Sequence, residues 1–147
     1  MIADKINIRE VEESDIIRLV GLLNQLGYDE TADEIKNRIV KITKHKTGNV
    51  FVAEYDQGNI IGCVQAMIDT RLAGGTYGEV VSLVVDKSFR GKGIGKNLIE
   101  HAIDWIKSRG ESRLRIRCNS LREETHEIYK HLGFVEKKSQ IIFEKKI

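Results

Sequence analysis

The amino-acid sequence predicts a mixed α/β fold in which helices flank a central sheet. Apolar and polar residues alternate over 6–11 and 113–118, which is typical of strands with one buried face. Apolar residues recur at helical spacing over 15–26 and 94–109. The nearly continuous β-branched run at 79–85 has the composition of a central strand. Strands and helices therefore interleave along the chain, as in mixed α/β domains.

The first third of the chain is expected to hold one strand and two helices. The strand covers 6–11, and Ser14 is placed to cap a helix over 15–26. Gly27 then suits the left-handed position that ends a helix. The segment Thr31-Ala-Asp-Glu34 has the pattern of a capping box and predicts the start of a second helix.

Three strands are predicted to follow. The apolar run at 50–55 and the strand at 60–68 are separated by the turn sequence at 56–59, which predicts a hairpin. The glycine-rich stretch at 73–78 reads as a mobile loop. The central strand at 79–85 comes directly after it.

The last third of the chain alternates helices and strands. A helix is expected over 94–109, a strand over 113–118 and a short helix over 122–132. From residue 135 onward the sequence reads as the last strands, which end in the apolar segment 141–144. The predicted order is β-α-α-β-β-β-α-β-α-β.

Composition argues for one soluble domain that covers residues 1–147. The chain has no proline and no low-complexity tract that would mark a linker. With 24 basic and 22 acidic residues, the net charge of +2 gives no indication of nucleic-acid binding. No apolar run approaches the roughly 18 residues of a membrane helix, and the first residues lack a signal-peptide pattern, so we expect a cytoplasmic protein.

Neither the cysteines nor the histidines predict a metal site. Cys63 and Cys118 lie far apart in sequence, without metal or redox spacing. The four histidines form no ligand pattern. We therefore expect no bound metal.

One segment has the features of an anion-binding site. The strand at 79–85 ends, a short loop turns, and the helix at 94–109 begins among glycines. The first turn of a helix leaves backbone N–H groups unpaired and carries a partial positive charge. Alternating glycines remove side chains that would keep a phosphate from the backbone. These glycines are Gly91, Gly93 and Gly95. The basic residues around them are Lys87, Arg90, Lys92 and Lys96.

Two common phosphate motifs do not fit this segment. A Walker motif would need glycine where Arg90 stands and Ser or Thr where Asn97 stands. The dinucleotide pattern GxGxxG would need glycine in place of Lys96. The alternative that the glycines only form a tight turn before the helix remains open.

The segment Arg90-Gly-Lys-Gly-Ile-Gly95 resembles the pyrophosphate-binding motif of the GNAT superfamily of N-acetyltransferases, (Arg/Gln)-x-x-Gly-x-(Gly/Ala). The strand before it is similar to that family's acetyl-CoA-binding strand. Downstream, Asn119, Tyr129 and Leu132-Gly-Phe134 resemble the second family signature. The element order agrees as well, so the resemblance covers essentially the whole chain. It implies a central, mostly antiparallel twisted sheet flanked by helices.

The resemblance implies acetyl-CoA as cosubstrate and places its contacts along the chain. The pyrophosphate would lie on backbone N–H groups of Arg90, Gly91, Lys92, Gly93, Ile94 and Gly95. Further phosphate contacts are expected from Lys92 and Lys96, which could equally be solvated. The pantetheine arm would pair, like an added strand, with the backbone of Leu83, Val84 and Val85. This strand would then splay from the one at 113–118. Asn119 would bind the cofactor or orient a water, although its separation from Tyr129 is longer than in the commonest form of the signature.

The chemistry implied is direct attack of a primary amine on the thioester in a ternary complex. A backbone N–H near Leu83 or Val84 would stabilise the oxyanion, and Tyr129 would protonate the departing thiolate. Glu79 is the candidate base, with an ordered water as the alternative. Two structural alternatives remain: Tyr129 as a core aromatic and Glu79 as an exposed carboxylate at a strand end. Cys118 has no activating partner at a recognisable spacing, so no covalent intermediate is expected.

The resemblance places the acceptor between residues 23–34, the loop at 71–78 and the tail from 135. The carboxylates near the first helix junction would suit a cationic acceptor, or they belong to a solvated capping segment; they are Asp29, Glu30 and Asp33. The acceptor is expected to be a small-molecule, protein or peptide amine. The family's C-terminal strand often pairs subunits, so the apolar segment 141–143 predicts a homodimer. A CoA-binding sensor with little turnover, or a different phosphate ligand, is an alternative.

Overall fold

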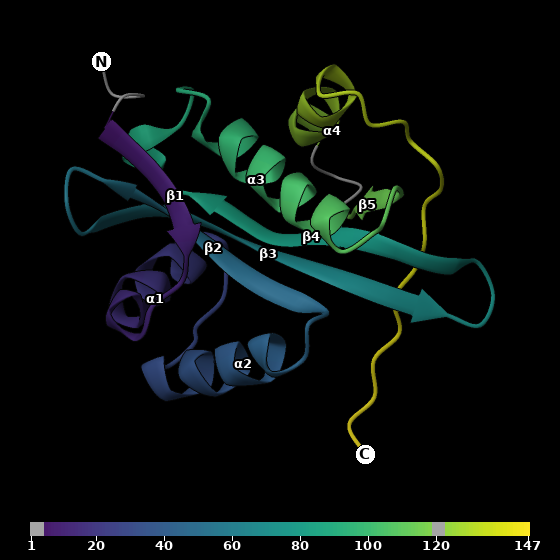
Figure 1. Cartoon of the computed structure of the whole chain (residues 1–147), viewed down its shortest axis with the longest axis horizontal. Helices are drawn as coiled ribbons and strands as arrows, with labels where there is room; N and C mark the ends of the chain where they lie inside the picture. Colours follow the sequence, from purple (N-terminus) through teal and green to yellow (C-terminus); the bar gives the residue numbers. More distant parts are fainter. Residues whose placement is uncertain (1–4, 119–122) are drawn as a thin grey trace. The chain divides into compact units, whose positions relative to one another are not determined.

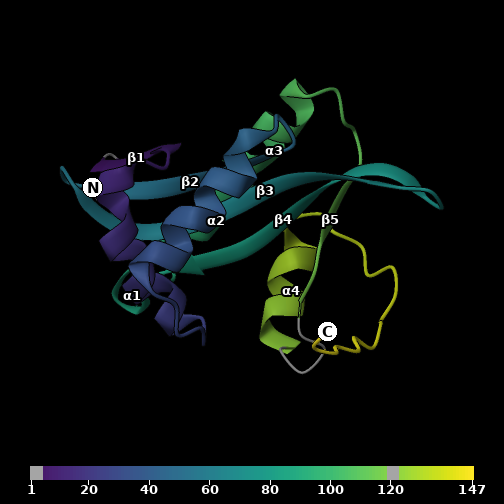
Figure 2. The same ribbon diagram turned by 90° about the horizontal axis from the view of Figure 1, so that it is seen from below.

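The structure is a computed structural model that describes residues 5–118 and 123–147 (Figures 1 and 2). The chain divides into two compact units, residues 1–116 and 117–147. Each unit is described by itself below. Within the described residues, no helix is both long and apolar enough to cross a membrane.

The first unit contains a five-stranded sheet with the strand order β1-β2-β3-β4-β5. The strands are β1 (Ile6–Glu10), β2 (Gly48–Tyr55), β3 (Asn59–Arg71), β4 (Gly75–Val85) and β5 (Leu114–Ile116). The first three pairings are antiparallel and the pairing of β4 with β5 is parallel. The prediction of a mostly antiparallel sheet in a mixed α/β fold is confirmed.

Helices cover both faces of this sheet. They are α1 (Ile16–Gln25), α2 (Ala32–Lys44), α3 (Ile94–Ser108) and two short 3-10 turns, η2 (Glu13–Asp15) and η3 (Lys87–Phe89). Figure 1 shows α3 on one face and α1 with α2 on the other. Two glycines allow α3 to approach closely: a Cβ at Gly62 would lie 3.0 Å from Leu98, and one at Gly78 would lie 2.5 Å from Ile106. Gly78 therefore marks the α3 face of β4.

The predicted N-terminal caps of the helices are confirmed only in part. The predicted capping box of α2 is confirmed, because Glu34 N–H donates to Thr31 Oγ1 at 3.2 Å. The predicted cap at Ser14 is wrong. Asp15 ends η2 instead and accepts the N–H of Glu12 at 2.7 Å. Its carboxylate is buried and also accepts two bonds from Arg9, at 2.8 and 2.9 Å, so the turn is held by a buried acid that the cap pattern does not reveal.

The predicted loop at 73–78 is largely strand. The hairpin of β3 and β4 continues to the pair Arg71↔Gly75, so only three residues form the turn. Gly74 and Gly75 have φ values of 99° and 84°, a left-handed conformation that glycine adopts without steric cost. These two glycines close the hairpin tightly instead of forming a mobile loop.

The second unit contains α4 (Glu123–His131), and a left-handed Gly133 follows the helix. The predicted last strands are wrong for this chain, because residues 134–147 carry no strand. A strand exists only where a neighbour supplies hydrogen bonds, and the described residues offer this segment no paired partner. The strand predicted at 113–118 is likewise shorter, since β5 has three residues.

Candidate active site

The glycine loop connects β4 to α3 through η3. Gly91 and Gly93 have φ values of 77° and 80°, so both positions require the left-handed conformation that favours glycine. A Cβ at either position would meet nothing within 4 Å, which means that the space beside this backbone is open. Gly95 already belongs to the helix, where a Cβ would only touch Val85 at 3.7 Å. The three glycines therefore serve different purposes.

The start of α3 presents a set of backbone donors. Gly93 is the N-cap and has no side chain to cap the helix. The first helical hydrogen bond runs from Asn97 N–H to Gly93 O at 3.1 Å. The N–H groups of Ile94, Gly95 and Lys96 therefore have no acceptor within the helix. Together with the open space at the glycines, these donors fit a pyrophosphate.

Three of the basic residues around the loop differ in their partners. Arg90 donates from Nε to Val85 O at 3.0 Å, so its side chain ties the loop to the end of β4. Lys96 lies 3.9 Å from Glu100, a long surface ion pair that contributes little. Lys92 is exposed, and no ion pair of Lys92 is present among the described residues. Lys92 and Lys96 thus remain available to a phosphate, whereas Arg90 has a positioning contact.

The loop is also anchored to α1. Asp86 caps η3 by accepting Ser88 N–H at 2.8 Å, and this backbone hydrogen bond is the main reason that the pKa of Asp86 is lowered. Gln25, the last residue of α1, donates to Asp86 at 3.3 Å and accepts Lys87 N–H at 3.0 Å. These bonds fix the path between β4 and the glycines.

A β-bulge interrupts β4 directly before the loop. Cys63 pairs with Val84 and Gln65 with Val81, so two residues of β4, Ser82 and Leu83, face one residue of β3. Ser82 has a φ of 53°, uncommon for a residue with a side chain. Such bulges re-aim side chains and increase the local twist of the strand. Ser82 is exposed in a strand that is otherwise largely covered.

The outer edge of β4 is paired with a strand over only part of its length. Parallel pairing with β5 covers only Gly78–Val80, so Val81–Val85 have no strand beside them on this edge among the described residues. Asp86 N–H donates to Ile61 O at 2.7 Å, and backbone direction alternates along a strand. The backbone groups of Val84 therefore point to β3, and those of Leu83 and Val85 point to the open edge. The contact of Arg90 with Val85 O agrees with this direction.

The cofactor-binding residues predicted on β4 differ in the direction of their backbone hydrogen-bonding groups. Pairing between β4 and the next strand stops at Val80↔Ile116, so the expected splay between the two strands stays a prediction. Leu83 and Val85 direct hydrogen-bonding groups to the gap, whereas Val84 is turned toward β3 and buries its side chain. Of the two candidate oxyanion donors, the alternation favours Leu83 N–H.

Glu79 lies inside β4, between Met67 of β3 and Arg115 of β5. Its side chain is buried, with 6% exposure, so the alternative of an exposed carboxylate at a strand end is wrong. Neighbouring residues of a strand point to opposite faces. Because Gly78 faces α3, Glu79 faces the side of α1 and α2. Its role as a base stays a prediction.

The second signature is only partly described. Tyr129 lies on α4, half-buried, with its ring 5.9 Å from that of Phe134 in an edge arrangement. Phe134 N–H also donates to Tyr129 O at 3.0 Å, a hydrogen bond that satisfies a carbonyl at the end of the helix. Asn119 lies outside the described residues. The predicted roles of Tyr129 and Asn119 therefore remain predictions.

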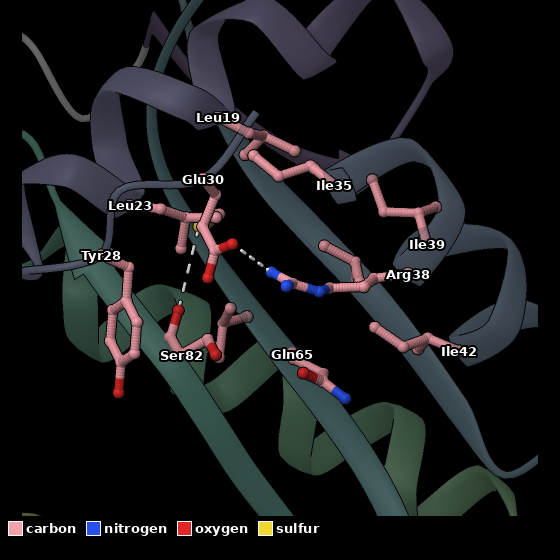
Figure 3. Close-up of a pocket in the computed structure, with 13 residues that line it drawn as sticks. Leu19, Leu23, Tyr28, Glu30, Ile35, Arg38, Ile39, Ile42, Gln65 and Ser82 are labelled. Atoms are coloured by element: carbon pink, nitrogen blue, oxygen red, sulfur yellow. Dashed lines mark hydrogen bonds and ion pairs between the residues drawn. The ribbon is translucent and has the colours of Figure 1, made fainter. Parts of the chain in front are cut away.

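A pocket of about 250 Å³ lies on the α1 and α2 face of the sheet (Figure 3). Its apolar walls include Leu19, Leu23, Ile35, Ile39 and Ile42. Gln65 of β3 and Ser82 of β4 supply polar atoms beneath these helices. Glu30 pairs with Arg38 across the pocket at 2.6 Å. The pocket thus borders the bulge of β4.

The acidic residues near the first helix junction do not assemble into one site. Glu30 is neutralised by Arg38, while Asp29 and Asp33 are exposed. The structure thus supports the alternative of a capping segment for these residues. Cys63, which also borders the pocket, is no nucleophile, since burial raises the pKa of its thiol to about 12.

Sequence reasoning missed Ser82 and Gln65 as pocket residues. The one available signal for Ser82 was a hydroxyl in the middle of the apolar run 80–85. Gln65 similarly interrupts the apolar strand β3. Neither signal discloses the bulge, because the bulge depends on how β4 pairs with β3.

The Acetyltransferase (GNAT) family model matches residues 16–134, which is most of the chain. The chain belongs to the GNAT acetyltransferase family. The predicted family is thereby confirmed. The match includes both the glycine loop and the second signature.

Similar proteins of this family cover almost the same length. A glucosamine 6-phosphate N-acetyltransferase of Arabidopsis thaliana is 29% identical over 147 residues, 95% of this chain and 96% of the relative. An IAA acetyltransferase of Azospirillum brasilense is 30% identical over 122 residues, 83% of this chain and 78% of the relative. Their names agree with the predicted enzyme class.

Solved structures show the same fold. The crystal structure of a glucosamine-6-phosphate N-acetyltransferase from Arabidopsis thaliana has a TM-score of 0.83 at 28% identity, covering 96% of this chain and 99% of that one. An aminoglycoside N-acetyltransferase in complex with CoA has a TM-score of 0.85 at 23% identity, covering 97% and 95%. The second likeness concerns the fold alone.

Proposed function

We propose that this protein transfers an acetyl group from acetyl-CoA to a primary amine of a small molecule. One observation carries the proposal: the glycine loop joins the unpaired N–H groups at the start of α3 to a strand whose outer edge has no paired strand past Val80 among the described residues. The first feature suits a pyrophosphate and the second suits an amide-containing arm. The name of the Arabidopsis relative, a glucosamine 6-phosphate N-acetyltransferase, favours a small-molecule acceptor.

When bound, acetyl-CoA supplies the thioester that carries the acetyl group. The N–H groups of Ile94, Gly95 and Lys96 hold its phosphates, and Lys92 adds charge at the same place. Leu83 and Val85 bind its arm through their backbone. Leu83 N–H, next to the bulge, donates to the thioester oxygen and stabilises the negative charge that develops there.

The pocket beside the bulge receives the acceptor. Ser82 and Gln65 lie where the pocket meets β4, so their side chains can orient an amine toward the open edge. Glu79 is four residues before Leu83, about 13 Å along a strand. We propose that the Glu79 carboxylate takes the amine proton through ordered water. Tyr129 gives a proton to the leaving thiolate.

Calorimetric titration of acetyl-CoA tests the cofactor site. Wild-type protein is expected to bind in the micromolar range and Gly93→Asp to lose binding, because the change places a strained, negative residue at the N-cap. Gly110→Asp is the matched control: Gly110 is also left-handed, with φ 90°, and lies at the opposite end of α3. A wild-type protein that does not bind acetyl-CoA would refute the proposal.

Release of CoA in the presence of a panel of primary amines then tests the reaction. An enzyme shows amine-dependent release, whereas a CoA-binding sensor shows binding without release. The control is Gly110→Asp, which should retain both properties if the loop is the cofactor site.

A further inference from the structure

Three arginines surround one tyrosine ring at the far end of the sheet. The guanidinium carbons of Arg115, Arg113 and Arg71 lie 4.2, 5.6 and 5.9 Å from the centroid of the Tyr77 ring. Tyr77 is itself only 1% exposed. The arginines come from β3, from β5 and from the residue before β5, so the cluster exists only in the folded sheet.

This arginine cluster (Arg71, Arg113 and Arg115 on Tyr77) lies on the same face as the pocket. Gly78 faces α3, so Tyr77 points to the opposite side of the sheet. Tyr77 pairs with Asp69, two positions beyond Met67 and four beyond Gln65 of the pocket. Figure 1 shows the β3 and β4 hairpin extending past α1 and α2, which leaves this end of the face uncovered by those helices.

The positive charges of the cluster are only partly neutralised. Arg71 pairs with Asp69 at 2.9 Å. Arg113 donates to the backbone carbonyl of Gly74, which has no full charge. Arg115 is half-buried, and no carboxylate of the described residues lies within ion-pair distance of it. The guanidinium groups of Arg113 and Arg115 therefore lie beside the same Tyr77 ring, and neither has a carboxylate partner among the described residues.

We propose that the arginine cluster binds a phosphate monoester carried by the acyl acceptor. The inference rests on the proposed acetyl transfer and specifies its acceptor as a phosphorylated primary amine. A phosphate monoester carries a charge of about −1.5 to −2 at neutral pH, which matches the two unneutralised guanidiniums. Stacking on Tyr77 fixes the planar guanidinium groups, and each such group can bind two phosphate oxygens at once.

The spacing suits an acceptor with its amine and phosphate at opposite ends. Arg115 stands beside Glu79 in the parallel register, and Glu79 is four residues, about 13 Å, before Leu83. A phosphate held by the arginine cluster therefore leaves the other end of a small molecule directed along the face toward the pocket and the bulge.

Paired substrates test the inference. ω-Aminoalkyl phosphates of increasing chain length are compared with the aminoalkanols that lack the phosphate and with ω-amino carboxylates. Wild-type kcat/KM should favour the phosphates, with an optimum at one chain length. In Arg115→Gln, kcat/KM for the best phosphate should fall at least about tenfold, mostly through KM, while that for the aminoalkanol stays unchanged.

Arg109→Gln provides a matched control. Arg109 also stacks on an aromatic ring, 5.1 Å from Trp105, but it follows α3 on the other face of the sheet. This variant should keep the wild-type preference. Arg115→Lys retains the positive charge but not the planar guanidinium group, so it should recover only part of the lost kcat/KM for the phosphate.

Binding gives a second readout that needs no turnover. Calorimetric titration of the best aminoalkyl phosphate into the CoA-bound protein should show binding that Arg115→Gln weakens and Arg109→Gln does not. Equal use of phosphates and aminoalkanols would overturn the inference and leave the proposed acetyl transfer intact, as would a preference for carboxylates. Acetyl-CoA binding without release of CoA to any amine would instead overturn the proposed function.

Discussion

Gly93 and Gly95 are two residues apart in the same motif, yet alanine at each should have opposite effects on stability. Gly93 has a φ of 80° and Gly95 is helical. A Cβ would meet nothing within 4 Å at Gly93 and would make an ordinary 3.7 Å contact with Val85 at Gly95. Neither change is limited by space, so backbone conformation alone decides the outcome.

The magnitudes follow from that conformation. An L-residue in the left-handed region costs about 1–2 kcal/mol, so Gly93→Ala should lower the free energy of unfolding by that amount. Replacing a helical glycine by alanine stabilises by about 0.5–1 kcal/mol, so Gly95→Ala should raise it. For a chain of this length each kcal/mol corresponds to a shift in Tm of about 2–4 °C.

Acetyl-CoA affinity should separate the same two variants. If the loop of Gly93→Ala relaxes to a less strained φ, binding must restore the original conformation, and the affinity falls by up to about tenfold. Gly95→Ala keeps the helix start, and the family motif accepts alanine at that position, so the affinity should fall much less.

Thermal unfolding and calorimetric titration measure both effects. Gly21→Ala is the control, because Gly21 lies inside α1 with open space around it and should gain about 1 kcal/mol without any effect on binding. A Gly93→Ala protein as stable as wild type, or a destabilised Gly95→Ala protein, would show that the reasoning from φ is mistaken.

Three further predictions concern other parts of the chain. Tyr129→Phe should lower kcat at least about 100-fold and leave acetyl-CoA affinity unchanged if the hydroxyl is the acid; an unchanged kcat would exclude that role. Burial raises the pKa of Asp15, but hydrogen bonds from Arg9 and Glu12 outweigh it and lower the pKa below 3.8. The contribution of Asp15 to the free energy of unfolding should therefore be complete above pH 3.8 and disappear as the pH falls through the lower pKa of the folded state. Acid titration of Asp15→Asn should lack this contribution. Sedimentation should show a homodimer in which the exposed Ile142 is covered, and Ile142→Lys should shift it to monomer; a wild-type monomer at micromolar concentration would refute this.

The glycine loop was predictable because its features are local. The end of an apolar strand, alternating glycines and an amphipathic helix lie within a dozen residues, and each has a local conformational signature. The capping box of α2 was predictable for the same reason, since Thr31 and Glu34 bond to one another.

Other parts could not be predicted because they depend on distant partners. Ser14 has the residue type of a cap, but Asp15 takes the position because Arg9 of β1 is beside it. The segment 73–78 has the composition of a loop, but β3 continues far enough to pair with most of it. Residues 141–143 have the composition of a strand and still form none, because strand pairing needs an edge from elsewhere.

The sequence by itself determined the alternation of strands and helices, the family and the position of the glycine loop, because these follow from periodicity and short motifs. Only the tertiary structure decided where β4 bulges, which backbone groups of Leu83 and Val85 face the open edge, and that Glu79 is buried. It alone brought Arg71, Arg113 and Arg115 onto Tyr77. These features depend on strand register, in which a shift of one residue turns every side chain to the other face, and register is set by contacts between residues far apart in the chain.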